Sequence, residues 1–144
     1  MKRKSLEGNA CAIARSLDII GDWWSLLIVR DVAGNVRRFS DIQRHLGIPK
    51  NILSARLKAL QEHEILKTAS TEGAHHEYHL TPRGRALIPV LVAIGQWGRD
   101  NLFDGNETCY VALDIATEQP LAKLELRSAD GRLLDVDDVL IRDE

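Results

Sequence analysis

Residues 37–60, RRFSDIQRHLGIPKNILSARLKAL, decide the fold that this sequence predicts. The stretch holds two short amphipathic segments with Gly47 between them, a pattern typical of two helices joined by a tight turn. Its charge is almost entirely positive, because six Lys or Arg side chains stand against the single acid Asp41. A helix-turn-helix with one positive face suits the major groove of DNA, which admits an α-helix and is lined by phosphates.

Both helices of this stretch have recognisable starts. Ser40 is the expected N-cap of the first, which ends at Gly47. The second spans about 49–63, with Pro49 near its start, where the missing N–H costs nothing. Its buried stripe comprises Leu53, Leu57 and Leu60.

Apolar spacing predicts two further helices before this stretch. One covers 10–20 and ends at Gly21, and the next covers 23–33 with Asp22 as its expected N-cap. The helix over 23–33 is apolar almost all round, so we expect it at the centre of the core.

A hairpin follows the quoted stretch. Residues 65–70 and 75–80 have the composition of strands, and 71–74 have that of a turn. Two helices followed directly by a hairpin predict a winged helix.

A long helix is expected from Thr81, its N-cap, and Pro82, its first residue, to about Asn101. Pro89 lies inside it and should bend or break it locally. The apolar side of this helix is longer than one small domain needs. The apolar residues on this side either pair with the first helix of a second copy or fill the core of the same chain. The candidate dimer residues are Ile13, Leu17, Leu87, Leu91, Ile94 and Trp97.

Residues 104–144 form a different piece. Alternating residues at 109–115 and 121–127, with a third run at 136–141, predict a small antiparallel β meander. A meander this short is marginal alone and should pack on the main body or on a partner subunit. The expected fold class is therefore α+β: a mostly helical winged helix-turn-helix domain over 1–103, with a β appendage over 104–144.

The net charge of −2 conceals two unequal parts. Residues 1–103 hold 15 Lys and Arg against 10 Asp and Glu, a net of +5, whereas 104–144 hold 4 against 11, a net of −7. The local field steers association with DNA, so the acidic C-terminal part does not argue against DNA binding.

Composition excludes several classes of protein. With 144 residues, 44% of them hydrophobic and 28% charged, the chain suits one globular domain with an appendage. Its apolar runs are too short to span a bilayer, and no apolar segment follows the basic N-terminus, so no signal peptide is expected. Two cysteines about a hundred positions apart make no disulfide framework, and the cytoplasm is the expected compartment.

Several motifs occur in a characteristic order after an N-terminal cysteine, Cys11. They are IGDWW at 20–24, RFSDI at 38–42, LSARLKAL at 53–60, EYHLTPRGRAL at 77–87 and Trp97-Gly98. Over roughly residues 10–99 the chain resembles the HxlR-type family of bacterial winged helix-turn-helix regulators. The resemblance implies a cytoplasmic DNA-binding homodimer that pairs through the first and last helices of the domain, with repression as the default action.

The chain also departs from that family. The wing at 70–76 lacks the proline-rich tip that many members carry. Many members stop shortly after the Trp-Gly pair, so the resemblance does not define the role of residues 104–144.

A recognition helix contacts bases mainly from its N-terminal half. The base-edge candidates are therefore Lys50, Asn51, Ser54 and Arg56. Asn can pair with adenine and Arg with guanine through two hydrogen bonds each. The phosphate candidates are Arg37, Arg38, Arg44 and Lys58, with His76 on the wing. The alternative is that these side chains are solvated surface charges.

Cys11 has two interpretations. It follows Lys2, Arg3 and Lys4, and positive charge or a helix N-terminus makes a thiol more reactive, which favours a sensor of oxidants or electrophiles. Some family members sense through a cysteine that Cys11 resembles. The alternative is a small buried apolar residue. Cys109 lies among apolar residues and is expected to pack, and the sequence does not support a disulfide between the two.

The sequence offers little support for a metal site or for catalysis. His75, His76 and His79 lack the further ligands of a tetrahedral metal site, and no catalytic or cofactor motif is present, so neither an enzyme nor a cofactor is expected. A winged helix used only to bind proteins remains an alternative to DNA binding. Trp23, Trp24 and Trp97 either line a pocket for an unidentified effector or belong to the core.

Overall fold

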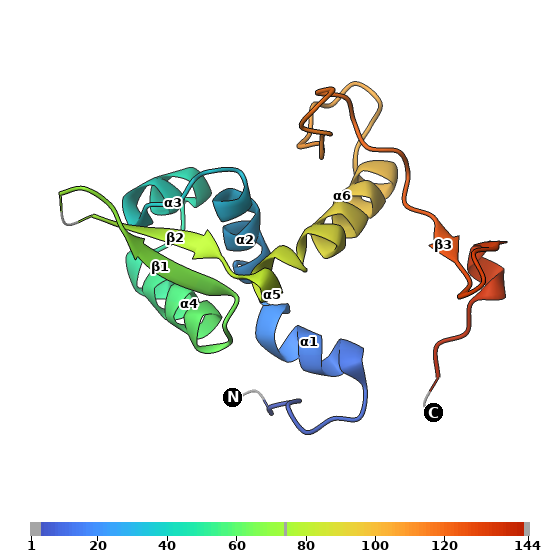
Figure 1. Ribbon diagram of the computed structural model, residues 1–144, viewed down its shortest axis with the longest axis horizontal. Coiled ribbons are helices and arrows are strands. Elements are labelled where there is room, and N and C mark those ends of the chain that lie inside the picture. Colours follow the sequence, from blue (N-terminus) through green and yellow to red (C-terminus); the bar gives the residue numbers. More distant parts are fainter. Residues whose placement is uncertain (1–3, 74, 143–144) are drawn as a thin grey trace. The chain divides into compact units, whose positions relative to one another are not determined.

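The computed structural model describes residues 4–73 and 75–142 (Figure 1). Six helices, two strand pairs and one 3₁₀ turn follow one another along these residues. They are α1 (Ala12–Ile20), α2 (Ser25–Ala33), α3 (Phe39–Leu46), α4 (Lys50–Glu62), β1 (Leu66–Ser70), β2 (His76–Leu80), α5 (Pro82–Arg85), α6 (Ile88–Leu102), β3 (Leu126–Arg127), β4 (Leu133–Leu134) and η1 (Val136–Asp138). Contacts divide the chain into two units between Leu91 and Val92.

The first unit is a winged helix built around α2. Ile28 and Val29 of α2 are completely buried, as expected for a helix that is apolar almost all round. Ile42 of α3 and the predicted leucine stripe of α4 complete the centre of this core. The remaining buried members of the core are Ile20, Val32, Ile48, Ile65 and Leu66.

The wing is an antiparallel hairpin of β1 and β2. Its register pairs Leu66 with Leu80 at one end and Ser70 with His76 at the other. The backbone N–H of Tyr78 donates to the carbonyl of Arg37 over 2.8 Å, which ties β2 to the segment just before α3. The predicted α+β winged-helix class is confirmed.

The predicted break near Pro89 divides the last helix of the domain into α5 and α6. Thr81 caps α5 as expected, because its hydroxyl accepts from the Gly84 N–H at 3.0 Å, and Pro82 is the first helical residue. Pro89 then lies in the first turn of α6, where no helical N–H bond is lost.

Of two other predicted N-caps, one is confirmed and one is wrong. Asp22 caps the turn that enters α2, since its carboxylate accepts from the backbone N–H groups of Trp24 and Ser25. The prediction for Ser40 was wrong: α3 begins two residues earlier than it implied, at Phe39, and Arg38 is the N-cap without a side-chain hydrogen bond.

The second unit contains the end of α6 and residues 104–142. The predicted three-strand meander was wrong in extent, because only β3 and β4 pair, over two residues each, with one isolated bridge between Leu113 and Pro120. Residues 136–138 form η1 instead of a strand, since the side chains of Asp135 and Asp138 form a capping box around that turn.

Polar contacts hold 121–124 to α6 where a strand was expected. Gln96 donates to the carbonyl of Ala122 at 3.1 Å and accepts from the N–H of Leu124 at 2.8 Å. Lys123 lies 2.8 Å from Asp100. These backbone groups therefore bond to a helix side chain and not to a neighbouring strand. Within the described residues, no helix is both long and apolar enough to cross a membrane.

Candidate nucleic-acid interface

The turn between α3 and α4 is fixed by backbone geometry. Gly47 has φ +64°, the left-handed conformation that terminates many helices, and its N–H donates to the carbonyl of Gln43 at 2.9 Å. Ile48 then inserts into the core at 2% exposure. Pro49 precedes α4 with the extended ψ of 138°, so the new helix starts in a fixed direction.

α4 has one buried face and one exposed polar face. Leu53, Leu57 and Leu60 are buried to 1% exposure or less. The exposed residues on other sides include four of the predicted DNA contacts: Lys50, Asn51, Ser54 and Lys58. Lys58 lies 4.0 Å from Glu62 one turn further on, and both side chains are well exposed. An exposed surface pair of this kind is weak and can be exchanged for a phosphate.

Arg56 lies on a different flank of α4. A step of two residues turns it about 160° away from Ser54 around the helix axis. Its guanidinium is 3.5 Å from the Asp22 carboxylate, and its side chain is only 38% exposed. Arg56 therefore connects α4 to the turn that enters α2.

Asp22 collects several donors at that turn. Its partial burial acts to raise the pKa, but hydrogen bonds from the Ser25 hydroxyl and from the N–H groups of Trp24 and Ser25, together with the Arg56 charge, outweigh it. The pKa of Asp22 is consequently lowered from its ordinary value of 3.8.

Asp22→Asn keeps an acceptor oxygen but removes the charge. Because the folded pKa is below 3.8, the carboxylate stabilises the fold fully above that value and progressively less as pH falls through the folded pKa. We expect the wild type to be the more stable protein at neutral pH, and the gap to close in acid. Urea unfolding across this pH range measures the gap, and a gap that persists unchanged in acid would contradict the assignment.

Three of the predicted phosphate contacts are arginines within α3 or just before it. Arg44 is exposed on α3 and lies 2.8 Å from Asp41. Arg38 lies 3.9 Å from Glu77 of the wing. Arg37 is half-buried, and its Nε has no hydrogen-bond partner among the described residues. A shallow, open depression of about 490 Å³ lies between α3 and the turn; its lining residues are Ser40, Gln43, Arg44, Gly47 and Ile48.

The wing carries two exposed histidines, His75 and His76. His76 begins β2 and is exposed, whereas His79 lies 3.3 Å from Glu77. The carbonyl of His75 accepts from both the backbone N–H and the hydroxyl of Thr71, which closes the hairpin. Across residues 4–73 and 75–142, no three His, Cys, Asp or Glu side chains gather as a metal site would require.

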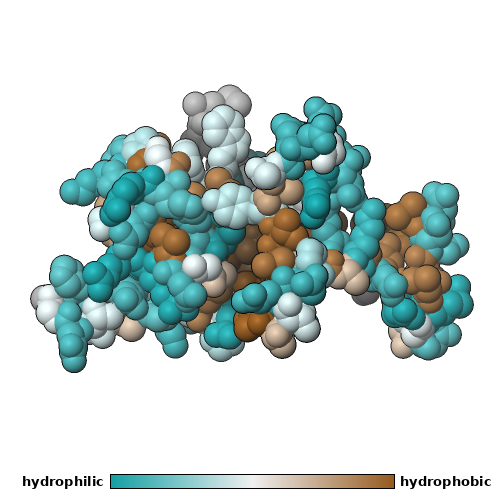
Figure 2. All heavy atoms as spheres, turned by 90° about the horizontal axis from the view of Figure 1, so that it is seen from above, coloured by the Kyte–Doolittle hydropathy of each residue, from teal (hydrophilic) through white to brown (hydrophobic). Residues whose placement is uncertain are grey.

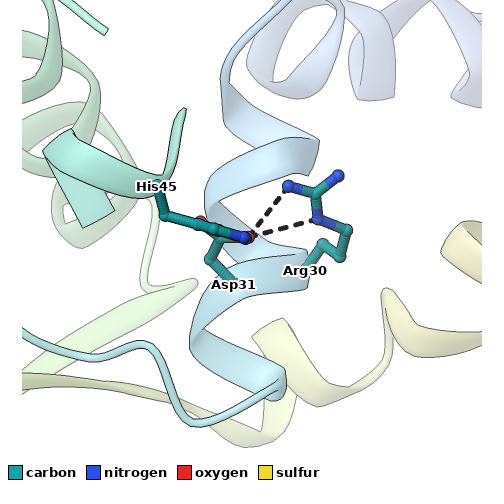
Figure 3. A network of polar contacts seen from close by, with 3 residues as sticks. All are labelled: Arg30, Asp31 and His45. Atoms are coloured by element: carbon teal, nitrogen blue, oxygen red, sulfur yellow. Dashed lines mark hydrogen bonds and ion pairs between the residues drawn. The ribbon is translucent and has the colours of Figure 1, made fainter. Parts of the chain in front are cut away.

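Sequence reasoning missed a buried carboxylate at Asp31. Its side chain is 1% exposed and lies between Arg30 and His45 (Figure 3). One oxygen accepts from the Nε and Nη2 of Arg30 at 3.2 and 3.0 Å, and the other lies 2.7 Å from His45 Nδ1. The pair with His45 joins α2 to α3 and so fixes the helix that precedes α4. An acid inside an otherwise apolar helix was the available signal.

The scaffold and its polar surface match a known family. Residues 19–105 match the family model described as HxlR-like helix-turn-helix, which is more than half of the chain. The chain belongs to the HxlR-like helix-turn-helix family. The predicted resemblance is confirmed.

Relatives of this HxlR-like chain are transcription regulators. Rv3095 of Mycobacterium tuberculosis, an uncharacterized HTH-type transcriptional regulator, is 40% identical over 93 residues. The match covers 63% of this chain and 59% of Rv3095, so the chain spans about three fifths of that relative's length. The family model and the name of this relative support the predicted DNA-binding transcriptional regulator.

Solved structures support the same assignment. PA1607, described as a candidate transcription factor, is 43% identical with a TM-score of 0.90, covering 98% of this chain and all of that one. A MarR-family regulator of Porphyromonas gingivalis W83 is 27% identical with a TM-score of 0.59, covering 71% of this chain and all of its own. Because PA1607 matches almost the whole length of this chain, it carries a C-terminal segment comparable to residues 104–142.

The candidate dimer residues of this HxlR-like chain fall into two groups. Leu87 and Leu91 are half-buried and pack against the core of the first unit. The other four expose about half of their surface: Ile13 53%, Leu17 48%, Ile94 51% and Trp97 61%.

The structure also shows the positions of the two cysteines and of Trp23 and Trp24. Cys11 is exposed at the N-cap of α1, and Cys109 is half-buried outside any strand. Trp24 packs on the core, as one interpretation expected, whereas Trp23 is 87% exposed. Of the cations that precede Cys11, Lys4 is described, while Lys2 and Arg3 lie outside the described residues.

Proposed function

We propose that this regulator binds a palindromic operator as a homodimer and places α4 in the major groove. The observation that carries the proposal is the exposed polar face of α4, which follows a rigid left-handed turn and lies apart from the buried leucine face. In this proposal Lys50, Asn51 and Ser54 approach base edges, and Arg56 acts by holding α4 to Asp22. Phosphate contacts are assigned to Arg37, Arg38, Arg44, Lys58 and His76.

The proposed homodimer pairs α1 and α6 with those of a second copy. Ile13 and Leu17 of α1, with Ile94 and Trp97 of α6, remain half-exposed in one chain, although apolar side chains gain about 25 cal/mol for each Å² they bury. A two-fold dimer would present two copies of α4 to two half-sites. We assign DNA binding and dimerisation to 1–103, repression as the action and the cytoplasm as the compartment.

Salt dependence tests DNA binding. Purified protein is titrated against the DNA upstream of its own gene at two salt concentrations, with an unrelated duplex as the control. We expect a specific complex whose affinity falls steeply with salt, since phosphate contacts release counterions. A protein that binds neither duplex would support the alternative, a winged helix that binds only proteins.

Redox control through Cys11 is a second candidate function. The thiol is exposed at the start of α1, a helix that the proposed dimer uses, so oxidation or addition of an electrophile there would alter the interface. We expect diamide to release the wild type from DNA and to leave Cys11→Ser bound. Equal release of both proteins would exclude Cys11 as the sensor.

A further inference from the structure

Residues 104–142, here called the arm, have no core of their own. No residue of the arm is fully buried, and Cys109, Ser128 and Leu134 alone within it are half-buried. Twelve of its large apolar side chains are exposed: Tyr110, Val111, Leu113, Ile115, Leu121, Leu124, Leu126, Leu133, Val136, Val139, Leu140 and Ile141. Figure 2 shows apolar surface over the C-terminal segment that includes β3, at the right of the view.

Polar contacts with α6 hold one short part of the arm, residues 122–124. The side chain of Gln96 makes two hydrogen bonds to the backbone there, and Lys123 pairs with Asp100. Fixing one residue costs about 1–2 kcal/mol of backbone entropy, and a hydrogen bond returns about 1 kcal/mol. An arm of this length therefore needs a second apolar surface against which to pack.

We propose that this surface is a second copy of the chain and that the arm of each protomer packs on residues 1–103 of its partner. The inference rests on the homodimer proposed above and assigns most of its interface to the arm. A second copy is made with every copy of the chain, so it is always available to cover a segment that lacks a core.

Charge indicates which part of the partner the arm contacts. Residues 104–142 hold 9 Asp and Glu against 4 Lys and Arg, whereas residues 1–103 carry a net charge of +5. Two arms would repel each other, but an arm and the 1–103 part of a partner attract. This complementarity favours a reciprocal exchange of arms, in which the same contact occurs twice about a two-fold axis.

The apolar surface is also continuous with the helix expected at the dimer interface. Ile94, Trp97 and Leu102 of α6 are exposed in the same unit that holds the arm, and Gln96 fixes the arm to that helix. A stable interface takes about 20–30 residues from each partner. The twelve apolar residues of the arm, with those of α6 and α1, supply most of that number.

Charge placed on the arm tests the proposal in the full-length chain. Ile115→Asp, Leu140→Asp and Ile141→Asp are combined, because these side chains are 98%, 74% and 77% exposed and their loss should not unfold a protomer. The control combines Thr117→Asp, Gln119→Asp and Ala129→Asp, which add the same charge at exposed positions of the same arm. Sedimentation equilibrium without DNA gives the dissociation constant of each dimer.

We expect the triple apolar variant to dimerise at least about 100-fold more weakly than the wild type, and the control to stay within about threefold. Circular dichroism should show the same helical content in all three proteins. A triple variant that dimerises as tightly as the control would overturn the proposal. Because no DNA is present, a wild type that fails to bind any operator would refute the proposed function without changing this result.

Zero-length cross-linking identifies the surface that the arm contacts. A carbodiimide is applied to dimers mixed from ¹⁴N and ¹⁵N chains, so that links between copies are separated by mass from links within one copy. Links from Asp135, Asp137 or Asp138 to lysines of 1–103 in the other copy are expected. Links confined to one copy, or links only between the two arms, would overturn the exchange.

Discussion

Lys50→Ala combined with Lys58→Ala should abolish most of the operator affinity. Both side chains extend from the exposed part of α4 and have no buried partner. Loss of Lys58 removes one proposed phosphate contact from each half-site, so the slope of log affinity against log salt falls by about 1.8 for the dimer, at roughly 0.9 per contact. Between about 1 M salt, where counterion release contributes nothing, and 0.15 M, this lowers the affinity about 30-fold. Loss of the proposed base-edge contact of Lys50 from both half-sites, at about 1 kcal/mol each, lowers the affinity about 30-fold more, so the total loss is about 1000-fold. Fluorescence anisotropy of a labelled operator at several salt concentrations measures both quantities.

The matched control removes the same charge from the arm. Arg132→Ala and Arg142→Ala are exposed and lie outside α4. The control should keep the wild-type salt slope, and the unfolding curves of all three proteins should coincide. If the lysine variant showed the same salt slope of affinity as the control, these side chains would not lie at the DNA surface.

Gly84→Ala should strongly destabilise the winged helix. A Cβ at this position would lie 2.2 Å from the carbonyl oxygen of Ile65 and 3.2 Å from Leu80 Cδ2. The carbonyl belongs to the backbone that leads into β1, so the clash cannot be relieved by a change of rotamer. Overpacking of this kind costs about 3 kcal/mol, which urea unfolding would resolve.

Gly95→Ala is the matched control for that substitution. Gly95 lies within α6, and a Cβ there would meet no atom within 4 Å. Alanine should stabilise the helix by about 0.5–1 kcal/mol, since glycine loses more backbone freedom on folding. Equal effects of the two substitutions would show that α5 does not lie against Ile65 in solution.

The winged helix could be predicted from the sequence because its signals are local. Gly47, Thr81 and Pro82 mark element ends by their own backbone chemistry, and the leucines of α4 repeat at helical spacing. The family motifs agree with these signals. Arg38 replaces Ser40 as the N-cap of α3, a shift of two residues that is within the usual uncertainty at a helix end.

The remaining features depend on distant partners that a pattern does not show. Arg56 has the spacing of a groove residue, but its partner Asp22 lies in the turn before α2, 34 positions earlier. Asp31 is held by His45 from another helix. In the arm, alternating residues predicted strands, but Gln96 of α6 takes the backbone groups that a neighbouring strand would have used.

Hydroxyl-radical footprinting of the wild type on its operator tests most directly whether α4 enters the major groove as part of a dimer. A two-fold dimer predicts two equivalent protected blocks whose centres lie about one helical turn, 10–10.5 base pairs, or a multiple of it apart. The Lys50 and Lys58 double variant should lose both blocks together. A single block, or protection that the double variant retains, would contradict the proposed interface.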